Sequence, residues 1–267
     1  METKDQRDYN VDSIRGRGMR VVRVLHEGDC RYGLADHDTV TLISDEPFAA
    51  WEPESVVALN HAELLAPVVP TKVVCVGLNY RGHIKEMGHD IPDEPVIFIK
   101  PSTAVSGPRA SIVIPPGVGR VDYEAELAVV IGRRTHRAGR KEARANILGY
   151  TCGNDVTARD LQKVDGQWTR AKGFDGFCPI GPWVETDADP ADLLVECYVN
   201  GERRQSARTS EMIFDVYDLV SFVSNVMTLV PGDVVLTGTP SGIGPLVAGD
   251  TVEVRIEDVG SLVNHVM

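Results

Sequence analysis

The sequence predicts an α+β fold that is predominantly β, with a small N-terminal module ahead of a larger domain. Its strand-like segments are short, apolar and rich in β-branched residues, and glycine, proline and aspartate turns separate them. Only one segment shows a clear helical spacing of apolar residues. Because strands and helices do not alternate regularly, a doubly wound nucleotide-binding fold is disfavoured.

The N-terminal module is expected over residues 19–66. It contains three strand-like segments, at residues 19–26, 30–35 and 39–43. The prolines within residues 67–70 mark its end, since the apolar run that follows them starts a new unit. The larger domain is therefore expected over residues 67–267.

The first eighteen residues precede this module. They carry four acidic and four basic side chains and no apolar stretch. We therefore expect residues 1–18 to be a disordered tail, and we expect no signal peptide.

The larger domain contains further strand-like segments, at residues 73–76, 96–100, 123–131, 147–152, 194–199, 234–237 and 251–256. One amphipathic helix is expected over residues 213–227, with Thr209 or Ser210 as its N-terminal cap. Two shorter helices are expected at residues 80–87 and 156–163.

The charge balance restricts the partners. Of the 267 residues, 27 are Lys or Arg and 39 are Asp or Glu, so the formal net charge is −12. An acidic chain disfavours nucleic acid and anionic membranes as partners, because phosphates attract basic faces. No run of about 18 uncharged apolar residues is present to span a bilayer. The five cysteines are scattered and form no C-x-x-C pair, which suits a reducing cytoplasm rather than a disulfide framework.

Two glutamates head an apolar strand in the segment VDYEAELAVVIG. Glu124 and Glu126 point to the same side of this strand, because alternate residues share a face. Two carboxylates this close repel each other and lose solvation unless a cation neutralises them. A divalent ion is one explanation and a solvated strand end is the other, and the spacing alone favours neither.

Asp155 strengthens the metal hypothesis, although Asp at this place is also a good helix cap. Together with Glu124 and Glu126 it makes a set of oxygen ligands, which suits Mg²⁺, Mn²⁺ or Ca²⁺ rather than Zn²⁺. Three protein ligands leave about three of the six positions of an octahedral ion open. Open positions are what a catalytic ion needs.

His83 and Glu86 lie three residues apart on one face of the expected helix at residues 80–87. A carboxylate beside an imidazole sets its tautomer and raises its basicity, which is the arrangement of a general base. From the spacing alone, a surface His–Glu pair is the commoner explanation. Gly82 and Gly88 allow this segment to move as a lid.

Four polar side chains are candidates for holding a substrate carboxylate: Arg159, Gln162, Arg170 and Lys172. On spacing alone, each is more often a solvated surface residue. The glycine-rich turn at residues 236–244 adds backbone N–H groups and the Thr239 hydroxyl. It lacks the Gly-Lys-Ser/Thr of a P-loop, and Ser241 is not in a G-x-S-x-G elbow.

Six segments, taken in chain order, resemble the fumarylacetoacetate hydrolase family. They are GLNY at residues 77–80 with His83 and Glu86 after it, PVIFIKPS at 95–102, DYEAELAVVIG at 122–132, GNDVTARDLQ at 153–162, KGFD at 172–175 and PGDVVLTGTP at 231–240. The resemblance runs from about residue 70 to the C-terminus. The residues before it look like the small N-terminal module of the bacterial members.

The resemblance implies a mixed β-sandwich roll of the fumarylacetoacetate hydrolase type as the catalytic domain. It also implies one Mg²⁺ or Mn²⁺ per subunit on Glu124, Glu126 and Asp155, with Ca²⁺ as a substitute, and a homodimer. Lys172 and Gln162 match residues that contact substrate or polarise water.

In the same way, Thr239 matches a residue that binds the substrate carboxylate, and Arg159 lies in a matching segment and is expected to bind substrate. His83 and Glu86 match a catalytic dyad on a lid that orders when substrate binds. The chain departs from many relatives at one place: Arg81-Gly82 stands where they have Ala-Asp before the dyad histidine.

The activity that the resemblance implies starts from an enolisable 2-oxo acid, such as an acylpyruvate, that chelates the ion. The ion stabilises the enolate that develops. Our first expectation is hydrolysis of a carbon–carbon bond by water that the His–Glu dyad activates. The alternatives are isomerisation of 2-hydroxyhepta-2,4-diene-1,7-dioate or decarboxylation of a 2-oxo acid in aromatic catabolism, and more remotely a metal-binding protein without turnover.

Overall fold

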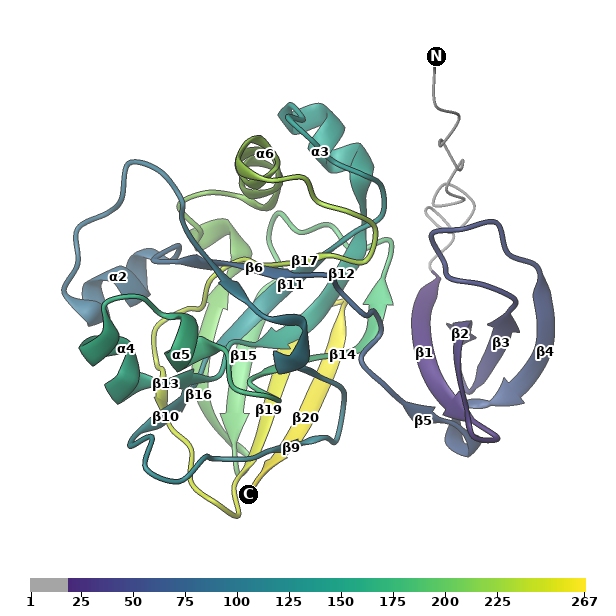
Figure 1. Cartoon of the computed structure of the whole chain (residues 1–267), viewed down its shortest axis with the longest axis horizontal. Coiled ribbons are helices and arrows are strands. Elements are labelled where there is room, and N and C mark those ends of the chain that lie inside the picture. The colour runs from purple at the N-terminus through teal and green to yellow at the C-terminus, as the bar shows by residue number, and fades with distance from the viewer. Residues whose placement is uncertain (1–18) are drawn as a thin grey trace.

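The computed structural model describes residues 19–267, and strands make up most of its regular structure (Figure 1). The predicted α+β, predominantly β fold is confirmed. The predicted tail at residues 1–18 lies outside the described residues. Among the described residues, no helix is long and apolar enough to cross a membrane.

A twelve-stranded sheet runs through both parts of the chain. Its strands are β1 (Arg20–His26), β2 (Asp29–Asp36), β3 (Thr39–Ile43), β4 (Pro53–Ala58), β5 (Glu63–Leu64), β6 (Val73–Gly77), β7 (Val96–Lys100), β8 (Val105–Ser106), β11 (Ala125–Ile131), β12 (Ile147–Asn154), β14 (Cys178–Glu185) and β17 (Val234–Leu236). The order along the sheet is β4-β3-β2-β1-β14-β12-β11-β17-β6-β7, with β5 paired to β1 and β8 to β14.

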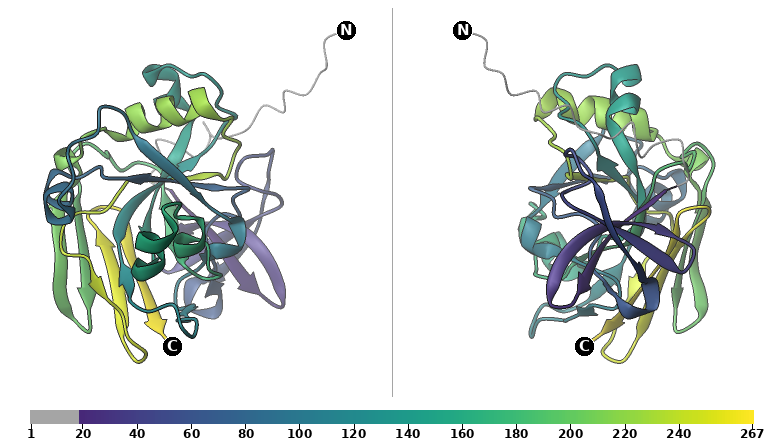
Figure 2. Two further views of the ribbon diagram at one scale, coloured as in Figure 1. Left: turned by 60° about the vertical axis from the view of Figure 1, so that its left-hand side comes forward. Right: turned by 90° about the vertical axis from the view of Figure 1, so that its right-hand side faces the viewer.

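The N-terminal strands β1 to β4 lie to one side of the remaining structure (Figures 1 and 2). They join the main sheet where β1 pairs with β14, through Arg20 opposite Glu185 and Val21 opposite Val184. The N-terminal module therefore extends the main sheet and does not form a sheet of its own.

Two smaller sheets complete the β structure. The five-stranded one has the order β16-β15-β19-β20-β9, and the three-stranded one has the order β13-β10-β18. Their strands are β9 (Ser111–Ile112), β10 (Val121–Tyr123), β13 (Thr157–Ala158), β15 (Leu194–Val199), β16 (Glu202–Arg208), β18 (Gly244–Pro245), β19 (Thr251–Ile256) and β20 (Gly260–Val266).

The main core lies between the twelve-stranded and five-stranded sheets. Leu127 and Val129 of β11 pack in one apolar cluster with Val195 of β15. The alternate residues of β11, Ala128 and Val130, belong to a second cluster on the opposite face. Apart from Glu126, β11 is apolar on both faces, and it is fully buried, as expected for a central strand of the sheet.

The helices are α2 (Arg81–Met87), α3 (Arg140–Asn146), α4 (Arg159–Asp165), α5 (Thr169–Lys172) and α6 (Val216–Val226). Short 3₁₀ turns occur at Leu59–His61, Ser102–Ala104 and Thr209–Glu211. Helices α3 and α6 lie together at the top of Figure 1, away from α2, α4 and α5.

The predicted cap of the amphipathic helix is wrong. Asp215 caps α6, because its side chain accepts hydrogen bonds from the backbone N–H of Tyr217 at 2.9 Å and of Asp218 at 3.1 Å. Thr209 and Ser210 belong instead to a separate 3₁₀ turn that ends before the helix begins. Ser, Thr and Asp all cap helices well, so the residue types alone could not distinguish these positions.

Two boundaries near the site also differ from those predicted. The expected strand at residues 123–131 is interrupted at Glu124, because β10 and β11 pair with different strands. The expected helix at residues 156–163 begins only at Arg159, since the residues before it form β13. Both differences come from long-range pairing, which local sequence does not encode.

Candidate metal centre and active site

The candidate site lies where β11 begins and β12 ends. The two strands are antiparallel, with Ala125 opposite Asn154, so the residues just outside this pair, Glu124 and Asp155, are neighbours. The Asp155 backbone N–H donates to the Glu124 carbonyl at 2.8 Å, and the Glu124 N–H donates to Asn154 Oδ1 at 3.0 Å. Sheet register therefore brings together two acids that are far apart in the sequence.

The three predicted metal ligands form one buried cluster. Glu124 is 4% exposed and Glu126 and Asp155 are each 1% exposed, and one carboxylate oxygen of each lies within 4.8 Å of the others. This burial rules out a solvated strand end. The helix-cap alternative for Asp155 is also wrong, because α4 follows Ala158 as its N-cap.

The donor set fits a divalent ion. Asp155 Oδ1 is buried and accepts no hydrogen bond from the described residues, although Lys100 Nζ lies 2.7 Å away as an ion pair. Oxygen ligands alone are typical of Mg²⁺, Mn²⁺ and Ca²⁺. Each carboxylate oxygen has two lone pairs, so an oxygen that is paired with a lysine can also ligate an ion.

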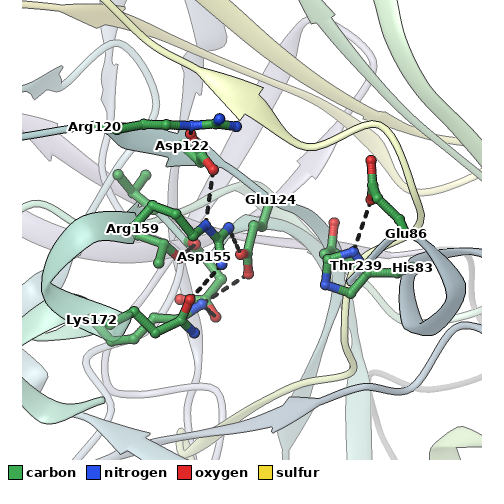
Figure 3. A network of polar contacts seen from close by, with 12 residues as sticks. His83, Glu86, Arg120, Asp122, Glu124, Asp155, Arg159, Lys172 and Thr239 are labelled. Atoms are coloured by element: carbon green, nitrogen blue, oxygen red, sulfur yellow. Dashed lines mark hydrogen bonds and ion pairs between the residues drawn. The ribbon is translucent and has the colours of Figure 1, made fainter. Parts of the chain in front are cut away.

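Two buried cations face this acidic cluster (Figure 3). Lys172 Nζ at the end of α5 lies 2.8 Å from Glu124 Oε2 and 2.6 Å from Asp155 Oδ2. Arg159 at the start of α4 forms an ion pair with Glu124 Oε1 and donates from Nε to Asp122 at 2.9 Å. Both side chains orient the acids, and their predicted contact with substrate stays a prediction.

The environment moves the pKa values of the two glutamates in opposite directions. Burial raises the pKa of Glu124, but the positive charges of Lys172 and Arg159 outweigh it, so the net pKa lies well below the usual value. Burial raises the pKa of Glu126, and the negative charges of Asp155 and Glu124 raise it further. Glu126 is therefore the acid that most needs a further cation.

The dyad lies on α2 across from the acids (Figure 3). His83 is 7% exposed and its Nδ1 lies 3.1 Å from Glu86 Oε2, so the imidazole is not on the surface as the spacing favoured, whereas Glu86 is exposed. Because Nδ1 faces Glu86, Nε2 is the ring nitrogen left to meet a bound molecule. The Gly242 N–H donates to Glu86 Oε1 at 3.1 Å, which holds α2 against the turn after β17.

A cavity of about 390 Å³ connects these groups. Its polar wall carries the acidic cluster, His83, Arg159, Gln162, Lys172 and Thr239. Its apolar wall includes Phe98 and Trp168, whose ring centroids are 5.0 Å apart in an edge-to-face arrangement. A Cβ at Gly77 would lie 2.9 Å from the Trp168 ring, so glycine there makes room for this wall.

The remaining candidates differ in where they lie. Gln162 accepts a hydrogen bond from Arg159 Nη1 at 2.6 Å and lines the cavity. Thr239 is 3% exposed, and its hydroxyl donates to the Ala125 carbonyl at 2.9 Å. Arg170 is exposed and pairs with Asp165, with Nε 2.7 Å from Oδ2, so the structure does not bring it to the cavity.

Sequence reasoning missed two buried side chains behind the acids. Lys100 is fully buried, and its Nζ donates to the carbonyls of Val156 at 3.0 Å and Lys172 at 2.6 Å. It stands in the segment at residues 95–102, so the resemblance offered a signal for it. Gln205 is 1% exposed and lies on β16, and no motif or spacing pointed to it.

The segment at residues 81–94, which contains α2, is expected to act as a lid. We expect amides of residues 81–94 to exchange hydrogen faster without ligand than with Mg²⁺ and oxalate, because this segment carries exposed glycines and polar residues. Hydrogen-exchange mass spectrometry checks this, with β15 as the internal control that should not change. Equally slow exchange in both states contradicts a lid.

Three buried carboxylates lie at the ends of two central strands and face a His–Glu pair across a cavity. This arrangement is typical of β-rich enzymes with a divalent-metal site. The profile of the fumarylacetoacetate (FAA) hydrolase C-terminal domain matches residues 72–267, and that of the Rv2993c-like N-terminal domain matches residues 19–67. The chain belongs to the fumarylacetoacetate hydrolase family.

Named relatives support this membership. Protein Rv2993c of Mycobacterium tuberculosis is 54% identical over 212 residues, which cover 78% of this chain and 80% of that protein. The mitochondrial oxaloacetate tautomerase Fahd2a of Rattus norvegicus is 44% identical over 220 residues, which cover 78% and 70%. The crystal structure of 2-hydroxyhepta-2,4-diene-1,7-dioate isomerase from Mycobacterium marinum is similar at a TM-score of 0.87 and 47% identity, covering 93% of this chain and 98% of that chain.

Proposed function

We propose that this protein acts on an enolisable 2-oxo acid, such as an acylpyruvate, and hydrolyses a carbon–carbon bond in it. The observation that carries the proposal is that the acidic triad and His83 line one cavity, with Glu86 bonded to His83 from behind. A divalent ion, when bound by Glu124, Glu126 and Asp155, supplies a Lewis acid that stabilises negative charge developing on the 2-oxo group.

The chain's own residues perform the remaining tasks. Glu86 accepts from Nδ1 of His83, so Nε2 is free to take a proton from water. Gln162 and the Thr239 turn offer hydrogen-bonding groups on the polar wall, where the substrate carboxylate is expected to lie. Phe98 and Trp168 exclude water from the opposite wall and contact the acyl group.

Isomerisation is the second candidate. A specific observation favours it, because two similar proteins are named as an isomerase and a tautomerase. Such chemistry needs only proton removal and return at carbon, and His83 and Lys172 both line the cavity as candidate proton carriers. Decarboxylation remains a third outcome of the same enolate chemistry.

One assay panel separates these candidates. Acylpyruvates, oxaloacetate and a 2-hydroxydienedioate are incubated with the enzyme and Mg²⁺, and loss of the enol is followed by ultraviolet absorbance. Formation of pyruvate from an acylpyruvate supports hydrolysis. If the enzyme only ketonises the dienedioate or the enol of oxaloacetate, the hydrolytic proposal is wrong and isomerisation replaces it.

Metal removal is a second test. We expect chelation by EDTA to abolish turnover, and Mg²⁺ or Mn²⁺ to restore it. Mn²⁺ is also expected to raise the melting temperature of the chelated protein in proportion to ln(1 + [Mn²⁺]/Kd), since the ion binds the folded acids only. Turnover that survives complete chelation contradicts the metal centre.

The predicted homodimer stays a prediction, which light scattering tests.

A further inference from the structure

We propose that Gln205 is a positioning residue that fixes the position of the His83–Glu86 dyad relative to the acidic triad. It lies outside the cavity, on the edge strand β16 of the five-stranded sheet. The side chain is 1% exposed, whereas Arg204 and Ser206 beside it are exposed. A buried amide between two exposed neighbours has turned inward, and its polar atoms require partners.

The Gln205 amide bonds to two different parts of the site. Its Oε1 accepts from the Ala125 backbone N–H at 3.0 Å. Its Nε2 donates to Thr239 Oγ1 at 2.8 Å and to the Pro240 carbonyl at 2.8 Å. One side chain therefore links the strand of the acids to the turn after β17.

The first partner lies between two of the acids. Ala125 separates Glu124 from Glu126, and its carbonyl accepts from the Thr239 hydroxyl at 2.9 Å. Gln205 and Thr239 thus hold both backbone polar groups of this residue. The acids also have their own supports, because Glu126 Oε2 accepts from the Gly238 N–H at 2.7 Å and Glu124 is held by Lys172.

The other partner leads to the dyad. Two residues beyond Pro240, the Gly242 N–H donates to Glu86, and the Gly242 carbonyl accepts from the Tyr123 hydroxyl at 2.9 Å. A Cβ at Gly242 would lie 2.2 Å from the Arg204 carbonyl, and φ there is +98°, so the turn is pressed directly onto β16. The position of Gly242 decides where Glu86, and with it His83, can lie.

The two ends of the link differ in how much they depend on Gln205. The Ala125 end is also held by sheet pairing and by Thr239, whereas Nε2 is the side-chain donor that fixes Pro240 to the sheet. Loss of the amide should therefore release the turn and the dyad while leaving the metal ligands in place. The inference rests on the proposed function only where turnover is measured.

The test uses Gln205→Met, which keeps the side-chain volume and removes all three hydrogen bonds. We expect kcat to fall by about 10²-fold, as for a catalytic pair displaced by about 1 Å. Mn²⁺ affinity, measured by electron paramagnetic resonance, should be unchanged. With Mn²⁺ and oxalate present, the backbone amides of α2 should exchange hydrogen faster in Gln205→Met than in the wild type.

Asn264→Leu is the matched control. Asn264 is 1% exposed on β20 of the same sheet, and its Nδ2 donates to the carbonyls of Gly107 at 3.0 Å and Ala110 at 2.9 Å, away from the cavity. This variant should lose comparable stability and keep its kcat and the exchange of α2. If Gln205→Met does not fold, Gln205→Glu serves, since it keeps an acceptor for Ala125 and loses the donor to Pro240.

The outcomes are distinct. The proposal is wrong if the Gln205 variant lowers kcat no more than Asn264→Leu does, or if Mn²⁺ affinity falls by the same factor as kcat. It is also wrong if the exchange of α2 does not change. If the wild type turns over none of the substrates, the proposed function fails, and metal affinity and hydrogen exchange still decide the role of Gln205.

Discussion

Glu126→Gln is expected to abolish turnover and to remove tight binding of Mn²⁺. The substitution keeps the volume of the side chain and an oxygen that can accept from the Gly238 N–H, so the fold is preserved. It removes one of three negative charges from a set of oxygen ligands, and hard divalent ions bind such sites through that charge. Isothermal titration with Mn²⁺ and the assay panel measure both effects.

The same substitution should stabilise the metal-free protein at neutral pH. Burial raises the pKa of Glu126 in the folded state, and the charges of Asp155 and Glu124 raise it further. The stability that this carboxyl contributes is therefore full below the ordinary glutamate pKa of 4.5 and is lost as pH rises through the folded value. The amide does not titrate, so the variant escapes this loss.

Urea unfolding in EDTA, repeated from acid to neutral pH, measures the difference. We expect the variant to gain over the wild type as pH rises, and Mn²⁺ to reverse the order at neutral pH. Glu185→Gln is the matched control: Glu185 is 7% exposed on β14 and pairs with Arg20 away from the cavity, so turnover should persist. A Glu126→Gln enzyme with wild-type activity would remove Glu126 from the metal centre.

The acidic triad shows what the sequence could predict. The two-residue step between Glu124 and Glu126 places both acids on one side of a strand in any register. The sequence could not predict that the strand breaks at Glu124, because the break depends on β10 and β11 having different partners. Nor could it predict the burial that excludes a solvated strand end, since burial depends on the whole fold.

The residues that sequence reasoning missed act over long distances in the chain. Gln205 meets Ala125 from 80 residues away, and Lys100 meets Lys172 from 72 residues away. Neither the local hydrophobic periodicity nor a short motif predicts such contacts. Strand β16 was itself missed, because six of its seven side chains are polar or charged, as at a sheet edge, and do not alternate with apolar ones.

The fold class was easier to predict than its details. Short apolar runs between turn residues indicate strands whichever sheet they join, which is why the predominantly β fold was predicted. Strand β14 contains two prolines and a glycine and lacks that signal, yet it joins the N-terminal module to the main sheet. Tertiary pairing stabilised a segment whose own propensity argues against a strand.

His83→Ala is expected to lower kcat for an acylpyruvate by about 10²–10⁴-fold, the usual contribution of a general base. His83 is buried beside the cavity and Glu86 orients it, so its loss removes the group that takes the proton from water. Oxalate binding should hardly change, because oxalate needs only the metal. His89→Ala is the control, since His89 lines the same cavity but is exposed and lies outside the dyad.

Measuring kcat and oxalate affinity together distinguishes loss of a base from a disturbed lid. A variant that merely disturbs the lid weakens both, whereas loss of a base lowers kcat alone. The kcat of Glu86→Gln should lie between those of the wild type and His83→Ala. The amide can still hold the imidazole by a hydrogen bond, but it cannot stabilise the protonated imidazole. Full activity of His83→Ala on an acylpyruvate would show that another group activates the water, and the hydrolytic role of the dyad would then be wrong.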